Sequence, residues 1–318
     1  MTGYPEALTD PSYFGQILVF TYPLVGNYGM PAAKNSMDWQ RCYEASSAMV
    51  SGMIVEDYSM EFSHYKADTS LAQWLYNQKI PAITGIDTRT LTRKIRESGV
   101  MLGKIIIGEE DVPLWDPNRT NLVQEVSVKQ VEKIGSGKKR IVLIDCGAKQ
   151  SIINELKLRE LDILRVPWDY PVREEHFDGL VLSSGPGDPM LCKPTIDQAQ
   201  YAFEHDIPTL GICLGHQIMA LAAGARTYKM KYGHRSQNQP VMDQRSRKGY
   251  ITTQNHGYAV KTDHMEKGWQ VLFENINDHT CEGLIHKSGK FFSTQFHPEA
   301  SPGPVDTRFL FDQFLALL

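Results

Sequence analysis

After Arg140 the sequence alternates between short apolar runs and amphipathic stretches, and this alternation restricts the fold more than any other feature. The apolar runs have the length of buried strands, and the amphipathic stretches have the length of helices. Strands that alternate with helices form parallel sheets covered on both faces. We therefore predict an α/β fold with a doubly wound, mainly parallel sheet. Its predicted strands are Ile141–Asp145, Ile163–Pro167, Gly179–Ser183 and Thr209–Cys213, and its predicted helices are Ser151–Leu158, Ile196–Glu204 and His216–Ala223.

The first half of the chain predicts a separate N-terminal α/β domain over residues 1–125. The polar, glycine-containing stretch at 126–139 is expected to be a linker, and the sheet domain is then 140–318. The final third is expected to be rich in strands and to close with a helix at Val305–Leu318. In the first domain the predicted strands are Gln16–Tyr22, Ala48–Val55 and Lys104–Ile107, and the predicted helices are Ser70–Asn77 and Thr88–Glu97.

Composition excludes several classes of function. A net charge of −4 over 318 residues, with both signs scattered, gives no basic surface for nucleic acid or for an anionic membrane. The 5 cysteines are odd in number and form no CxxC pair, which argues against a disulfide framework. The chain opens on turn-forming residues without an apolar signal segment. We expect a reducing, cytoplasmic location, with a small molecule or a protein as partner.

The stretch Gly211-Ile212-Cys213-Leu214-Gly215 places a thiol between two glycines, where a predicted strand gives way to a predicted helix. This spacing is typical of the sharp turn that displays a nucleophile. The start of a helix also favours the thiolate form. The alternative is an inert, buried cysteine, which is common among free cysteines.

Near the end of the chain, His297-Pro298-Glu299 offers a base and a carboxylate that could orient it. Residues two apart on an extended segment project to the same side, so the imidazole and the carboxylate can pair. A surface His–Glu pair without function is the alternative. His216 is expected to be structural because it is built into the start of a helix.

The segment Ser183-Ser184-Gly185-Pro186-Gly187-Asp188 follows a predicted strand. Its glycines can present backbone N–H groups to an oxyanion or a phosphate, and a simple tight turn is the alternative. No HExxH motif and no paired His/Cys cluster is present, so we predict no metal site.

Together, "GICLGHQ", "SSGPGDP", "TQNHGYAV" and "FHPEASPGP" resemble the class I, or triad, glutamine amidotransferases. The first domain, with "MTGYPEALTDPSY", "TYPLVGNYG" and "GIDTRTLTRKIRESG", resembles the glutaminase (small) subunit or domain of glutamine-dependent carbamoyl-phosphate synthetase. The resemblance covers nearly the whole chain. It implies hydrolysis of glutamine, with ammonia passed to a synthetase partner for pyrimidine or arginine synthesis.

Carried over by residue, the resemblance implies Cys213 as nucleophile, His297 as general base and then acid, and Glu299 as the residue that orients His297. It assigns the oxyanion hole to the backbone N–H groups of Gly185 and Leu214. It implies no cofactor in this chain, because ATP, bicarbonate and magnesium belong to the synthetase partner. The residues implied for glutamine binding are Ser12, Gly187, Gln217 and the backbone of Asn255, Gly257 and Tyr258.

The sequence departs from the family pattern in three ways. The β-rich opening that normally precedes the "TGY" stretch is absent, Ser184 replaces the usual asparagine, and Tyr258 replaces the usual phenylalanine. Two rival functions stay open. One is a cysteine hydrolase of γ-glutamyl compounds on the same fold, and the other is a non-catalytic structural subunit.

Overall fold

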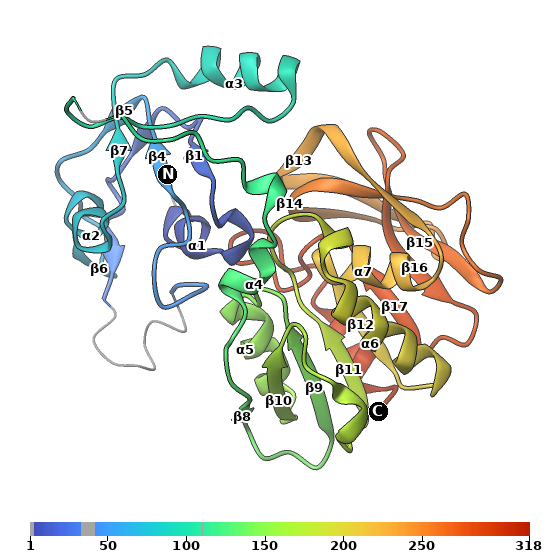
Figure 1. Ribbon diagram of the computed structural model, residues 1–318. Coiled ribbons are helices and arrows are strands. Elements are labelled where there is room, and N and C mark those ends of the chain that lie inside the picture. The colour runs from blue at the N-terminus through green and yellow to red at the C-terminus, as the bar shows by residue number, and fades with distance from the viewer. Residues whose placement is uncertain (1–2, 33–41, 110) are drawn as a thin grey trace. The chain divides into compact units, whose positions relative to one another are not determined.

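The computed structural model describes residues 3–32, 42–109 and 111–318 (Figure 1). The chain divides into two compact units, Met1–Leu122 and Val123–Leu318. Each unit has its own hydrophobic core, so we describe each by itself.

The first unit is built on a small parallel sheet in the order β1–β4–β7. Ser70 and Asp87 cap the two longer helices by accepting hydrogen bonds from the N–H groups of Gln73 and Thr90. The predicted α/β class and both predicted helices are therefore confirmed here. The strands are β1 (Ile17–Val19), β2 (Leu24–Val25), β3 (Met30–Pro31), β4 (Gly52–Ile54), β5 (Asp57–Tyr58), β6 (Ala67–Thr69) and β7 (Ala82–Ile83). The helices are α1 (Tyr4–Thr9), α2 (Leu71–Gln78) and α3 (Thr88–Ser98), with 3-10 turns η1 (Pro11–Tyr13) and η3 (Pro117–Arg119).

The strand predicted at Lys104–Ile107 is wrong, because this segment has no regular secondary structure. The side chain of Ile105 packs over Gly52 of β4, where a Cβ would lie 2.8 Å from Ile105 Cδ1. Ile107, by contrast, is 75% exposed. A preference for strand is expressed only where neighbouring strands cover the side chains, and among the described residues this segment has no such neighbour.

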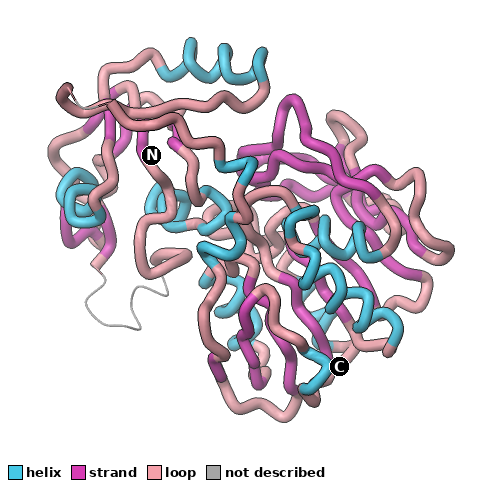
Figure 2. Tube along the Cα trace, in the orientation of Figure 1, coloured by secondary structure: helices cyan, strands magenta, loops and turns pink. Residues whose placement is uncertain are grey.

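The second unit contains a ten-stranded sheet in the order β14–β13–β15–β16–β17–β12–β11–β9–β10–β8 (Figure 1). The strands β10, β9, β11, β12 and β17 are mutually parallel, whereas β13 pairs antiparallel with β14 and β15, and β16 pairs antiparallel with β15 and β17. Figure 2 marks the strands in magenta and the helices in cyan. The bounds are β8 (Glu132–Ile134), β9 (Arg140–Asp145), β10 (Asp162–Pro167), β11 (Gly179–Leu182), β12 (Thr209–Ile212), β13 (Arg226–Asp243), β14 (Gly249–Lys261), β15 (Trp269–Asn275), β16 (Cys281–His286) and β17 (Phe291–Thr294).

Helices cover both faces of the parallel strands. Along β9, Ile141 and Leu143 pack into one core with α5 and α8, whereas Val142 and Ile144 pack into another with α6 and α7. The predicted doubly wound arrangement is therefore confirmed. The helices are α4 (Leu122–Val126), α5 (Gln150–Leu158), α6 (Lys193–Glu204), α7 (Leu214–Ala222) and α8 (Phe309–Leu315), with 3-10 turns η4 (Val172–Glu174) and η5 (Pro189–Leu191). No helix among the described residues is both long and apolar enough to cross a membrane.

The stretch expected as a linker, 126–139, contains β8, which pairs antiparallel with β10 at the edge of the sheet. Part of this stretch therefore belongs to the second unit. Asp145, at the end of β9, contributes to holding it there. Its buried carboxylate accepts hydrogen bonds from the N–H groups of Val128, Gly147 and Ala148 and pairs with Arg165 Nη2 at 2.6 Å.

We predict that Asp145→Ala lowers the free energy of unfolding by about 3 kcal/mol, because it leaves three N–H groups without their acceptor and leaves the Arg165 guanidinium with Glu132 as its remaining carboxylate partner. Asp162→Ala is the control, since Asp162 pairs with Arg140, which is 42% exposed. The control is expected to cost less than about 1 kcal/mol. Urea unfolding measures both variants, and equal losses would contradict the prediction.

Candidate active site

Cys213 lies at a sharp turn between β12 and α7. Its backbone has φ 53° and ψ −101°, a conformation that a non-glycine residue adopts only under strain. The hydrogen bond from Cys213 N–H to Thr294 O, at 2.8 Å, fixes this turn against β17. The predicted nucleophile therefore occupies the strained strand-to-helix turn that the sequence indicated.

The glycines around Cys213 are required by close packing. A Cβ on Gly215 would lie 2.1 Å from the carbonyl oxygen of Leu182, and a Cβ on Gly211 would lie 2.6 Å from the carbonyl oxygen of Gly215. Any side chain at these positions would push α7 away from the sheet. The glycines thus hold the start of α7 directly against the ends of β11 and β12.

The two predicted oxyanion donors lie close together. A Cβ on Gly185 would be 2.0 Å from Cys146 O and 2.9 Å from Leu214 Cδ2. Among the described residues, neither the N–H of Gly185 nor that of Leu214 donates a hydrogen bond. The first N–H groups of a helix have no partner within the helix, so that of Leu214 is available to an oxyanion.

His297 and Glu299 form the predicted pair. His297 Nδ1 donates to Glu299 Oε1 at 2.6 Å, and both side chains are buried. The N–H of His297 donates to Thr253 O on β14, which anchors the histidine beside that strand. Because β12 and β17 are parallel, their carboxyl ends bring Cys213 and the segment containing His297 to the same edge of the sheet.

Charge determines the protonation of this pair. Burial alone would lower the pKa of His297, but the Glu299 carboxylate, helped by the contact with Cys213, raises that pKa above its usual value. Burial would likewise raise the pKa of Glu299, but His297 and Lys149 hold that pKa below its usual range. At neutral pH the carboxylate is therefore ionised and the imidazole favours its charged form.

Two residues of this centre were missed by the sequence analysis. The ammonium of Lys149 is buried, lies 3.2 Å from Glu299 Oε1 and donates to Ala300 O and Ser301 O. Gln295 donates from Nε2 to Cys213 Sγ at 3.7 Å. Lys149 follows β9 at the same carboxyl edge as Cys213, so its position after a strand was the available signal.

The residues predicted to bind glutamine lie on α7 and β14, in the turn after β11, and in η1 of the first unit. Gln217 donates to Tyr258 O at 3.0 Å, which brings α7 and β14 together. The pairing of β13 with β14 is interrupted opposite Gly257, where the register shifts between Lys229 and His234. Of the three residues whose backbone is implied for glutamine binding, Gly257 lies in this interruption, whereas Asn255 pairs with Arg235 and Tyr258 pairs with Lys229.

The other residues predicted to bind glutamine are Gly187, Asn255 and Ser12. Gly187 has φ 89°, a left-handed conformation that favours glycine, in the turn after β11. Asn255 lies against the catalytic candidate, with Oδ1 2.9 Å from His297 Nε2. Ser12 belongs to the first unit, in η1, and its contact with glutamine stays a prediction.

His216 is not suited to act as the base, and Cys192 is not suited to act as the nucleophile. His216 is buried, its Nδ1 lies 2.8 Å from Ser293 Oγ, and burial lowers its pKa to about 3. A base this weak cannot activate a thiol at neutral pH. Burial likewise raises the pKa of Cys192 to about 12, so Cys192 stays a thiol.

One cluster in the described part of the chain has ligand atoms close enough for a metal: His234, His256 and Glu282, within 4.8 Å of one another. Hydrogen bonds already engage the ring nitrogens of both histidines and Oε1 of Glu282. His234 Nδ1 lies 3.1 Å from Glu282 Oε1, His234 Nε2 lies 2.9 Å from Asp278, and His256 Nδ1 lies 2.7 Å from Tyr258 O. The cluster therefore supports β14 from the side opposite Asn255.

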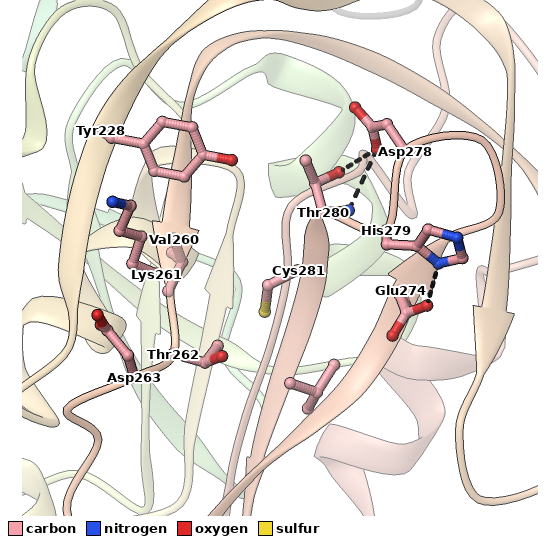
Figure 3. Close-up of a pocket in the computed structure, with 11 residues that line it drawn as sticks. Tyr228, Val260, Lys261, Thr262, Asp263, Glu274, Asp278, His279, Thr280 and Cys281 are labelled. Atoms are coloured by element: carbon pink, nitrogen blue, oxygen red, sulfur yellow. Dashed lines mark hydrogen bonds and ion pairs between the residues drawn. The ribbon is translucent and has the colours of Figure 1, made fainter.

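A surface pocket of about 470 Å³ lies among β13, β14, β15 and β16 (Figure 3). Tyr228, Lys261, Asp278 and Cys281 are among its lining residues. None of the predicted catalytic or glutamine-binding residues lines it, so this pocket is separate from the candidate active site.

We predict that Gly215→Ala lowers both the melting temperature and the reactivity of Cys213, because the new methyl group would overlap Leu182 O and displace α7. Gly103→Ala is the matched control, since a Cβ at Gly103 meets nothing within 4 Å. Calorimetry and the rate of alkylation by iodoacetamide measure the two effects. The prediction fails if the two variants are indistinguishable.

Two protein-family models match this chain, one in each half. The family model described as glutamine amidotransferase class-I matches residues 142–317, and the model described as carbamoyl-phosphate synthase small chain, CPSase domain, matches residues 1–105. A solved structure from Thermoplasma acidophilum, named as a subunit of GMP synthase, is 25% identical, with a TM-score of 0.51. It covers 56% of this chain and 93% of that one.

Two curated relatives match along almost the whole chain. The carbamoyl phosphate synthase arginine-specific small chain of Phaeosphaeria nodorum is 46% identical over 99% of this chain and 68% of its own length. The mitochondrial carbamoyl-phosphate synthase [ammonia] of Aquarana catesbeiana is 46% identical over 99% of this chain, which spans 22% of that protein.

Proposed function

The chain belongs to the class-I glutamine amidotransferases and carries the N-terminal domain of the carbamoyl-phosphate synthase small chain, and from this we propose that it hydrolyses L-glutamine to glutamate and ammonia. The observation that carries the proposal is the meeting of three features at one sheet edge. These are the strained turn at Cys213, the buried His297–Glu299 pair, and the N–H groups of Gly185 and Leu214, which have no acceptor among the described residues.

The proposed reaction begins with the Cys213 thiolate. Its sulfur attacks the carbonyl carbon of the glutamine side chain, and the N–H groups of Gly185 and Leu214 stabilise the negative charge on the carbonyl oxygen. The carbon–nitrogen bond then breaks, and the nitrogen takes a proton from His297 Nε2 and leaves as ammonia. A glutamyl thioester remains on Cys213.

In the second half of the reaction, neutral His297 takes a proton from water as the water oxygen attacks the thioester. The carbon–sulfur bond breaks, glutamate leaves and the thiolate returns. Glu299 acts through His297 by holding its ring and stabilising its charge. Ser12, Gly187, Gln217 and the backbone of Asn255, Gly257 and Tyr258 are proposed to hold the amino acid.

The ammonia is proposed to go to a carbamoyl-phosphate synthetase partner, either a separate subunit or a further part of a longer polypeptide. ATP, bicarbonate and magnesium are then used by that partner, and this chain needs no cofactor of its own. The relative from Phaeosphaeria is named as arginine-specific, which favours arginine synthesis over pyrimidine synthesis. We propose a cytoplasmic location, although the Aquarana relative is named as mitochondrial.

We predict that Cys213→Ala abolishes glutamine hydrolysis but leaves glutamine binding measurable, because the sulfur contributes to the chemistry more than to ground-state affinity. Cys192→Ser is the control and is expected to keep activity. Glutamate release and calorimetric binding are the measurements. A Cys213→Ala variant within about tenfold of the parent would exclude the proposed nucleophile. Preference for γ-glutamyl peptides over glutamine would favour the rival hydrolase.

We also predict that the isolated chain hydrolyses glutamine slowly and that the synthetase partner, with ATP and bicarbonate, accelerates it about a hundredfold. Ammonia released into water is protonated and lost as a nucleophile, so an uncoupled glutaminase would waste substrate. A preference of the partner for the active arrangement by about 3 kcal/mol is sufficient. Steady-state glutamate release with and without the partner tests this, and a fast rate that the partner does not change would contradict it.

A further inference from the structure

Both ring nitrogens of His297 face oxygen atoms. Nδ1 lies 2.6 Å from Glu299 Oε1, and Nε2 lies 2.9 Å from Asn255 Oδ1. A carboxylate oxygen and an amide oxygen are both hydrogen-bond acceptors, so each ring nitrogen must supply a proton. This arrangement satisfies an imidazolium and does not satisfy a neutral imidazole.

The backbone of β14 determines where Asn255 points. Thr253 O accepts the hydrogen bond from the backbone N–H of His297, and residues two apart on a strand project to the same side. The backbone bond brings this part of β14 beside His297, and the 2.9 Å contact from Asn255 Oδ1 to Nε2 shows that the Asn255 side chain faces the ring. Gln254 and His256 project to the opposite side, where Gln254 Oε1 lies 3.0 Å from His256 Nε2 and 2.8 Å from His234 Nδ1.

We propose that the side chain of Asn255 is a positioning residue that accepts the Nε2 hydrogen bond of His297 and so holds in place the proton that ammonia takes as it leaves. This inference rests on the proposed function. It adds a role for the side chain of a residue whose backbone alone was expected to contact glutamine. Asn255 acts through His297, in the way that Glu299 does at the other nitrogen.

An amide suits this position better than a charged acceptor. Among the described residues, the ionisable groups that act on the His297 ring are Glu299, Lys149 and Cys213. Glu299 and Cys213 favour the imidazolium, and the Lys149 ammonium opposes it. A second carboxylate in place of Asn255 would stabilise the imidazolium but would also oppose the negative charge that the proposed reaction requires on the Cys213 sulfur. The neutral amide oxygen supports the imidazolium without that repulsion.

The test is the titration of His297 itself, followed by NMR of the histidine rings. It is done in a Cys213→Ala background, which removes the coupling to the thiol, and the His297 signal is assigned by its loss in His297→Asn. Asn255→Leu is expected to lower the pKa of His297 by about one unit, because it removes the acceptor that favours the charged ring. Asn255→Asp is expected not to lower it.

Asn277→Leu is the matched control, because Asn277 is an exposed asparagine of the same unit, and it should leave the titration unchanged. Asn255→Ser, whose hydroxyl is too short to reach Nε2, repeats the test if the leucine variant does not fold. An unchanged pKa in the folded variants would overturn the proposal. A raised pKa would do so too, because it would mean that the amide donates to a neutral ring. Since the titration needs neither glutamine nor turnover, its result decides the role of Asn255 whether or not the parent hydrolyses glutamine.

Discussion

The buried hydrogen bond between His297 and Glu299 is the interaction on which the rest of the candidate active site depends. A buried carboxylate is costly unless it is paired and hydrogen-bonded, and Oε1 of Glu299 is paired with both the His297 ring and the Lys149 ammonium. Lys149 in turn donates to the carbonyl groups of Ala300 and Ser301, which hold the chain just after Glu299. The contacts of Glu299 with His297 and Lys149 therefore determine both the position of the His297 ring and its protonation.

Cys213 is held by packing. Its strained backbone is maintained because Gly211 and Gly215 let α7 begin directly against β11 and β12, where no side chain would fit. The same close approach brings Gly185 next to Leu214, so the turn that displays the sulfur also gathers the two N–H groups proposed for the oxyanion. The doubly wound sheet explains why the residues that follow β11, β12 and β17 meet, since these parallel strands end at one edge. The bridge between Thr253 of β14 and His297 adds β14 to the same place.

The sequence predicted the parallel half of the sheet and the candidate triad because each has a strong local signal. Alternating apolar runs mark β9 to β12, and glycine spacing marks Cys213. Lys149 and Gln295 were missed, because position after a strand is a weak signal for Lys149 and a single glutamine carries no pattern until the fold buries it. The strand expected at Lys104–Ile107 did not form, since isoleucine runs become strands only beside a pairing neighbour. β8 was hidden inside an apparent linker because its pairing with β10 and the contacts of Asp145 are not local in sequence.

The most direct test of this account is to find the covalent intermediate. The chain is mixed with glutamine, quenched in acid within the first turnovers, digested and analysed by mass spectrometry. One added glutamyl group is expected on the peptide that contains Cys213, and none on the peptide that contains Cys192. Steady formation of glutamate with no adduct on Cys213, or with the adduct on another cysteine, would contradict it.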